Sequence, residues 1–279
     1  MDDIHRSLRA VLAACVISAA WATPILAADE SPWSDDVRSA ARIVAGSSKN
    51  GDAQLRAGVE IKMQPGWKTY WRYPGDSGVP PHFDFSGSEN LKTATVLFPT
   101  PHLFTDETGQ TLGYKERVIF PVVVSPQQAG KPVRLRLKID YAVCEKLCVP
   151  AEGRAELVLA PGNSTHNADL SAAEARVPKQ VTPAQAGLTA RRVNAGSKPQ
   201  VTVDLAAPPG QPVELFVEGP TPNWALPIPK SAKSGADGRA KFSFDLDGMP
   251  PGFDPKSQVD LTYTVVTGDR AVEVKSRLD

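Results

Sequence analysis

Alternating apolar and polar positions mark extended segments along the first half of the chain. In Val133–Tyr141 the odd-numbered side chains are apolar or aromatic, and the even-numbered ones include Arg134, Arg136 and Lys138. Such alternation is typical of an antiparallel strand with one buried face and one face in water. The same pattern recurs in Ala53–Met63, Leu91–Phe98, Arg117–Val124 and Arg154–Leu159. A run of roughly six or seven strands over about 125 residues predicts an immunoglobulin-like β-sandwich.

A second set of extended segments follows a polar stretch rich in alanine, serine and proline. We therefore expect an all-β protein with two immunoglobulin-like β-sandwich domains in tandem, residues 29–160 and 185–279, joined by a linker over residues 161–184. In the linker, Ser171 and Glu174 have the spacing of a capping box, which predicts a short helix that ends before Pro178. The second set comprises Gln200–Leu205, Val213–Glu218, Arg239–Leu246, Gln258–Thr267 and Ala271–Arg277, with turn residues at Asp237-Gly238 and Thr267-Gly268-Asp269.

Residues 1–28 have the pattern of an export signal. Arg6 and Arg9 precede the apolar run Ala10–Ala20, and small residues end the segment, so we expect cleavage after Ala27 or Ala28. A transmembrane anchor is the alternative, but Pro24 and the short apolar length disfavour it, because spanning needs about 20 apolar residues. A second alternative is lipidation of Cys15, which ends a lipobox-like Leu-Ala-Ala-Cys. No later segment is long and apolar enough to cross a bilayer, and we expect an exported, soluble, periplasmic protein.

Composition and charge exclude several classes of protein. The chain has 31 basic and 31 acidic residues, whereas a nucleic-acid-binding protein should carry a basic excess. A hydrophobic fraction of 41% is too high for a wholly disordered chain. Three cysteines in 279 residues are too few for a disulfide-dense scaffold.

Two of these cysteines, Cys144 and Cys148, lie four residues apart at the end of a predicted strand. Fully extended, four residues span about 13 Å, whereas the Cα atoms of a disulfide lie about 4.4–6.8 Å apart. Any bond between them therefore requires the segment to turn sharply, as a tight loop or as one helical turn.

Three interpretations of the cysteine pair compete. A structural disulfide would remove little unfolded-state entropy from so short a loop, about 2 kcal/mol. A pair that cycles between dithiol and disulfide fits better, because short rings tend to be more reducible. The third interpretation is a site for a soft metal such as Cu(I). A zinc site is weaker still, because the histidines outside the signal, His82, His102 and His166, are not paired at ligand spacing.

Two predicted loops are candidates to line or cover the cysteine pair. Residues 66–78 place four aromatic side chains within seven residues and then turn at Pro74-Gly75-Asp76. Core packing accounts for some of these aromatics, but one strand face cannot bury all four. Residues 101–109 form a polar loop with one phenylalanine, which is either a solvated loop or a cap over the cysteines.

These features together resemble one known family. Gly66-Trp67 with Tyr70, Asp106-Glu107 before the strand with Phe120-Pro121, and Tyr141 ahead of a close cysteine pair and Pro150 are similar to the N-terminal periplasmic domain of the thiol:disulfide interchange protein DsbD. The stretch Trp67–Pro81 looks more like DsbD relatives of the ScsB type. The resemblance covers about residues 35–160, and the second sandwich resembles the extended N-terminal region of ScsB-type proteins more weakly.

The resemblance implies an immunoglobulin-like domain that needs no cofactor. It takes reducing equivalents from a membrane-embedded thiol reductase (DsbD-, ScsB- or CcdA-like) and passes them to periplasmic thioredoxin-like proteins, as in cytochrome c biogenesis or copper tolerance. Carried over, Cys144 and Cys148 are the redox pair, and Cys148 forms mixed disulfides with partners. Residues that would line or cap the site are Trp67, Tyr70, Phe104, Asp106, Glu107 and Tyr141.

Two departures from the family's pattern bear on this expectation. The two cysteines are closer together than in DsbD, and the chain carries no transmembrane or thioredoxin domain, so a separate membrane protein would have to supply electrons. The alternative function is a non-catalytic periplasmic binding module or a Cu(I)-handling protein that uses the same two thiols.

Overall fold

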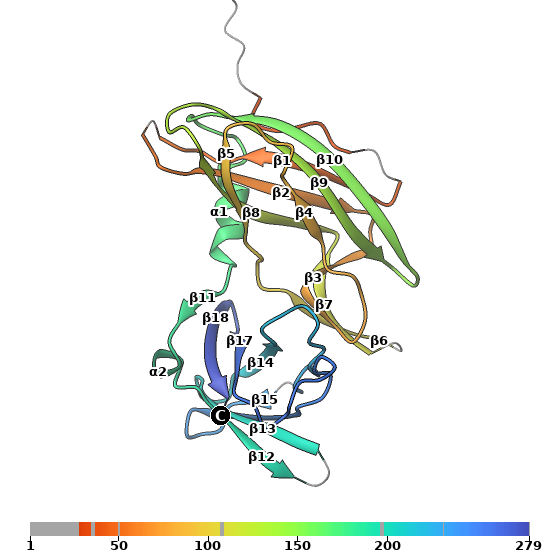
Figure 1. The fold of residues 1–279 in the computed structure, drawn as a ribbon, viewed down its shortest axis with the longest axis vertical. Helices are drawn as coiled ribbons and strands as arrows, with labels where there is room; N and C mark the ends of the chain where they lie inside the picture. The colour runs from red at the N-terminus through yellow and green to blue at the C-terminus, as the bar shows by residue number, and fades with distance from the viewer. Residues whose placement is uncertain are drawn as a thin grey trace, which may run out of the picture.

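The protein is all-β and consists of two sets of sheets stacked along its long axis, and the C-terminus lies in the lower set (Figure 1). The computed structural model describes residues 28–34, 37–49, 51–106, 109–195, 198–230 and 232–278. Residues 1–27 of the expected signal, which include Cys15, and the expected cap residue Glu107 lie outside the described residues. We call residues up to Pro178 the N-terminal region and the rest the C-terminal region.

The N-terminal region contains two antiparallel sheets. One sheet has the order β1-β2-β8-β5 and the other β10-β9-β3-β7-β6, with β4 paired to β9. The strand number exceeds the six or seven expected, because short strands such as β4 and β6 carry no clear alternation. The strands are β1 Ser39–Ala45, β2 Leu55–Met63, β3 Lys68–Gly75, β4 His82–Asp84, β5 Leu91–Val96, β6 His102–Asp106, β7 Gly109–Lys115, β8 Arg117–Pro126, β9 Val133–Cys144 and β10 Cys148–Leu159.

The core of this region lies between its two sheets. The odd-numbered apolar residues of β9 from Val133 to Val143 are all buried there, together with inward residues of β2 and β8. The alternation in Val133–Tyr141 therefore identifies the buried face, and the strand continues three residues beyond the segment expected from sequence.

Two elements of the expected linker, residues 161–184, pack on different sheets. Helix α1 (Asn167–Ala175) buries Leu170 against the N-terminal region, where a Cβ on Gly46 would lie only 2.6 Å from Leu170 Cδ2. The helix begins at Asn167, not at Ser171 as the capping-box spacing predicted, because the hydroxyl of Ser171 instead accepts a bond from Arg56. Further on, β11 (Lys179–Val181) pairs in parallel with β18 of the C-terminal region.

The C-terminal region has a five-stranded sheet, β11-β18-β17-β14-β15, and a three-stranded sheet, β12-β13-β16. A second hydrophobic cluster, which includes Val203, Phe244 and Tyr263, fills it. All five expected strands are present, and β11, β12 and β15 are additional. The remaining elements are α2 Pro183–Ala186, β12 Thr189–Ala195, β13 Lys198–Ala206, β14 Pro212–Glu218, β15 Ala232–Lys233, β16 Arg239–Asp245, β17 Val259–Thr267 and β18 Arg270–Leu278.

Strand β3 joins the two regions through its second half. The Trp71 ring is fully buried and meets Phe216 of β14 edge-to-face, with ring centroids 5.9 Å apart. The next residue, Arg72, donates to the carboxylates of Glu218 and Glu273. The Tyr73 hydroxyl donates to the carbonyl oxygen of Leu226. We call Trp71, Arg72 and Tyr73 with these partners the junction.

Candidate redox site

The two cysteines close a tight hairpin. Strand β9 ends at Cys144, β10 begins at Cys148, and the two residues are register partners in the antiparallel ladder. Their Cα atoms are 4.1 Å apart, and their sulfurs form a disulfide. The sharp turn that the spacing required is therefore a three-residue loop, Glu145 to Leu147, at the tip of the green hairpin in Figure 1.

The two sulfurs differ in exposure. Cys144 is 6% exposed, whereas Cys148 is exposed. Successive strand residues point to opposite faces, so Tyr141 and Val143 lie in the sandwich core and the residues between and after them do not. Ala142 and Cys144 instead form a separate small cluster with Tyr70. One sulfur is thus shielded on the outer face of the sheet, and the other faces solvent.

Tyr70 connects β3 to the exposed sulfur. Its hydroxyl oxygen lies 2.9 Å from Cys148 Sγ, and since a disulfide sulfur carries no proton, the hydroxyl donates this bond. Burial, with a smaller contribution from the Asp106 carboxylate, raises the pKa of Tyr70 above its ordinary value of 10.0. The hydroxyl therefore remains protonated at neutral pH and available as a donor.

The β6–β7 hairpin is tied to the same place by Lys68. The Lys68 ammonium bonds Asp106 Oδ2 at 3.0 Å and Thr111 Oγ1 at 3.1 Å, and it lies 5.2 Å from the centroid of the Phe104 ring. On β3, Lys68 is the register partner of Cys144 and lies two residues from Tyr70, hence on the same strand face. Sequence reasoning did not select Lys68, although its place two residues before Tyr70 was a usable signal.

The other two expected site residues lie differently. Trp67 is partly buried against the core and faces the guanidinium of Arg38, 5.9 Å from its ring centroid. Tyr141 is 3% exposed within the core, where its hydroxyl bonds Ser39 Oγ at 2.8 Å. The structure thus places Tyr70 against the Cys148 sulfur, and it places Phe104 and Asp106 of β6 against Lys68. Tyr141 lies on the opposite face of β9, in the core.

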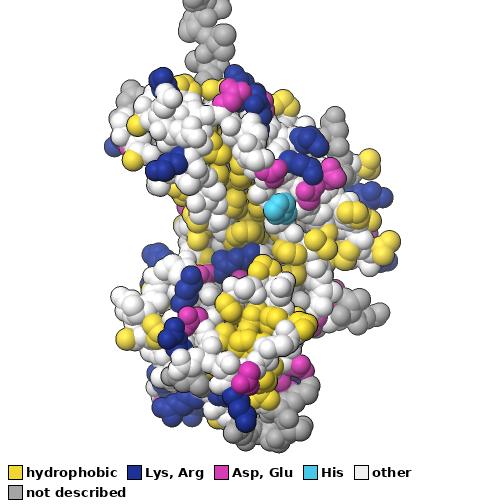
Figure 2. Space-filling model, in the orientation of Figure 1, with side chains coloured by type: hydrophobic (Ala, Val, Ile, Leu, Met, Phe, Trp, Pro, Cys, Tyr) yellow, Lys and Arg dark blue, Asp and Glu magenta, His cyan; other side chains and the backbone are white. Residues whose placement is uncertain are grey.

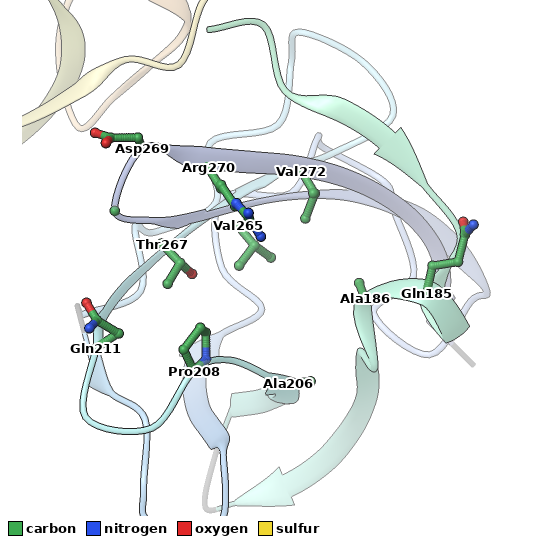
Figure 3. A pocket seen from close by; sticks show the side chains of 11 residues that line it. Gln185, Ala186, Ala206, Pro208, Gln211, Val265, Thr267, Asp269, Arg270 and Val272 are labelled. Carbon is green, nitrogen blue, oxygen red and sulfur yellow. The ribbon is translucent and has the colours of Figure 1, made fainter. Parts of the chain in front are cut away.

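The rest of the described chain offers little comparable chemistry. No group of three or more His, Cys, Asp or Glu side chains that could hold a metal occurs among the described residues. A cavity of about 520 Å³ lies between α2 and the β17–β18 turn, lined in part by Gln185, Val265, Arg270 and Val272 (Figure 3). Its lining contains no cysteine or histidine. Across the described part of the chain, no helix has the length and apolar character needed to span a membrane.

Comparisons with known proteins bear on the family and the fold of this chain. Residues 37–160 match the family model described as thiol:disulfide interchange protein DsbD, N-terminal. The fold is similar to the crystal structure of the N-terminal periplasmic domain of ScsB from Proteus mirabilis, with a TM-score of 0.71 and 20% identity over 90% of this chain and 98% of that chain. A protein of unknown function from Porphyromonas gingivalis W83 covers 84% of this chain and 94% of that chain at 11% identity, but its TM-score of 0.21 is too low to support an argument. A search of the curated proteins gave no match.

The likeness to the ScsB domain extends over both regions of the molecule and, at this identity, establishes the fold. The family match is confined to the N-terminal region and includes both strands of the cysteine hairpin. Residues 37–160 of this chain therefore belong to the DsbD N-terminal domain family.

Proposed function

We propose that this protein is a periplasmic thiol:disulfide interchange protein that works through Cys144 and Cys148. It receives reducing equivalents from a membrane-embedded thiol reductase and passes them to thioredoxin-like proteins of the periplasm. The observation that carries the proposal is the unequal exposure of two joined sulfurs, one at 6% and the other open to a partner. A ring this short adds little stability to the folded protein, and a disulfide that served only stability would not need an exposed sulfur.

The exchange follows from this asymmetry in two steps. In the reduced protein the Cys148 thiolate attacks one sulfur of a partner's disulfide; a mixed disulfide forms, and the partner's second sulfur leaves and takes up a proton. Cys144 then loses its proton and attacks Cys148 Sγ, which re-forms the internal disulfide and releases the partner as a dithiol. Two electrons pass to the partner. The membrane reductase then reduces the Cys144–Cys148 disulfide again by the same steps in reverse.

Tyr70 has a defined part in these steps. In the oxidised protein its hydroxyl donates to Cys148 Sγ, and in the reduced protein the same donor can bond the thiolate. A hydrogen bond to the charged form of an acid favours that form and lowers its pKa. Tyr70 therefore favours the reactive thiolate of Cys148.

Trapping the intermediate tests the proposal. In a Cys144→Ser variant the mixed disulfide at Cys148 has no resolving thiol, so disulfide-linked adducts with periplasmic proteins should accumulate and disappear on reduction. The matched control is Cys148→Ser, which leaves only the buried Cys144 and should trap little. Equal adduct yields from the two variants would contradict the assigned roles.

The reduction potential of the pair gives an independent test. Structural disulfides in exported proteins have potentials below about −300 mV, whereas exchange proteins lie higher. A value below about −300 mV for Cys144–Cys148 would make the pair structural and end the proposal.

A further inference from the structure

An exposed apolar side chain stands next to the reactive sulfur. Among the described residues, the large hydrophobic side chains that stand exposed are Val37, Val79, Leu147 and Val158. Leu147 is 75% exposed and directly precedes Cys148 in the hairpin loop. Figure 2 shows apolar side chains on the flank of the N-terminal region where Figure 1 places the tip of this hairpin.

Val79 lies in the loop that follows β3, next to a glycine that packs on the Tyr70 ring. Its neighbour Gly78 lies directly on the Tyr70 ring, since a Cβ on Gly78 would come within 3.0 Å of three ring carbons. The hydroxyl of that ring lies 2.9 Å from Cys148 Sγ. Val79 is 57% exposed, so a second exposed apolar side chain, from a different loop than Leu147, stands one residue from the glycine that packs on this ring.

The charges around this position cancel. Glu145 and Lys146, the other two residues of the hairpin loop, are both exposed and carry opposite charges. The Lys68 ammonium is paired with Asp106. These four charges balance in sign, which favours contact area over long-range attraction as the basis of binding at this position.

We infer that Leu147 and Val79 form the docking surface for a thioredoxin-like partner whose own reactive cysteine lies in an apolar surface. This inference rests on the proposed function and specifies how the partner is selected. A partner that forms a bond to Cys148 Sγ must cover the residue next to it, so Leu147 is buried in every mixed disulfide with a protein. A small disulfide such as oxidised glutathione covers far less and gains little from either side chain.

The test compares a protein partner with a small one. The reduced protein is mixed with oxidised thioredoxin or with glutathione disulfide, and the second-order rate is measured for wild type, Leu147→Ser and Val79→Ser. Burying a leucine side chain is worth enough for Leu147→Ser to slow exchange with thioredoxin about tenfold, with a smaller loss for Val79→Ser. The rates with glutathione disulfide should stay within about twofold of wild type.

Val158→Ser is the matched control. Val158 is also exposed, but it pairs with Arg134 at the opposite end of the same hairpin, about 33 Å along β10 from Cys148 at the usual rise per residue. This variant should leave both rates unchanged. Circular dichroism and the thermal midpoint of each variant verify that the fold is intact.

The outcomes separate the docking surface from the chemistry. If Leu147→Ser exchanges with thioredoxin as fast as wild type, or slows thioredoxin and glutathione disulfide equally, the docking surface is wrong while the exchange function stands. If wild type reacts with glutathione disulfide but not with thioredoxin, the partner class is wrong. If wild type reacts with neither, both the docking surface and the proposed function are overturned.

Discussion

Two hairpins, one in each region, differ in ways that show what a redox site needs beyond a turn. The β9–β10 hairpin ends in register partners Cys144 and Cys148 around a three-residue loop. The β17–β18 hairpin ends in register partners Thr267 and Arg270 around Gly268 and Asp269, with Gly268 at a φ of +57° that favours glycine. Both are antiparallel strands joined by a tight loop, but only the first carries thiols.

The surroundings of the two hairpins differ as much as their end residues. Beneath the first, β3 supplies Tyr70 to the exposed sulfur and Lys68 to the β6–β7 hairpin. Beside the second lies the cavity lined by Val265, Val272 and Arg270, and its lining contains no tyrosine or lysine. The comparison shows that the two hairpins differ in what the neighbouring strands place beside their ends, and under the proposed function this difference would make the cysteine pair reactive.

Strand β3 also explains the concentration of aromatic residues noted in the sequence. Its first half, with Tyr70, faces the cysteine pair, and its second half, with Trp71 and Tyr73, forms the junction with the C-terminal region. The four aromatics are thus divided among the core edge, the site and the junction. The site and the junction share one strand and adjoin each other.

The largest expected effect comes from moving the cysteine pair between the two hairpins. We predict that a variant with Cys144→Ser, Cys148→Ser, Thr267→Cys and Arg270→Cys exchanges with thioredoxin at least ~100-fold more slowly than wild type, because the second hairpin lacks the donor and the docking side chains. The double Cys→Ser variant sets the background rate. A transplanted pair within tenfold of wild type would show that a hairpin end suffices.

The next largest effect is expected at the junction. Trp71→Ala should lower the free energy of unfolding by about 3–5 kcal/mol, because it removes a fully buried ring that meets Phe216. Its indole Nε1 has no hydrogen-bond partner among the described residues, so Trp71→Phe should cost only about 1 kcal/mol. Chemical denaturation measures both, and equal costs for the two variants would argue against this packing account.

A smaller effect is expected from the charge that bridges the regions. Arg72→Met leaves Glu218 and the nearly buried Glu273 without their shared cation, which should destabilise the protein by about 2 kcal/mol. The matched control is Arg136→Met, whose partners Glu89 and Glu156 are exposed, so this substitution should destabilise the protein less than Arg72→Met. Denaturation midpoints that fall equally in the two variants would remove the distinction between junction and surface.

The smallest effect is expected at Tyr70. Tyr70→Phe removes the donor to the Cys148 thiolate, so the thiol form is favoured. The pH profile of Cys148 alkylation in a Cys144→Ser background should therefore shift to higher pH. Tyr73→Phe is the control, because that hydroxyl bonds Leu226 in the junction. Equal profiles for wild type and Tyr70→Phe would remove Tyr70 from the chemistry.

The sequence by itself determined the strand class and the location of the chemistry. Alternation in Val133–Tyr141 identified both the strand and its buried face, because a pleated strand places successive side chains on opposite sides. The four-residue spacing of Cys144 and Cys148 required a tight turn for any bond between them. The Thr267-Gly268-Asp269 turn followed from local backbone preference. Each of these rests on interactions within a few residues.

Only the tertiary structure decided the neighbours. Arg72 meets Glu218 and Glu273 across sequence separations of 146 and 201 residues, and no local pattern records such a pairing. Helix α1 begins four residues before the expected cap because Leu170 and Ser171 find partners on distant strands. Lys68 and Tyr70 acquire their roles because β3 lies between β9 and β7, and strand order is set by packing across the whole sheet.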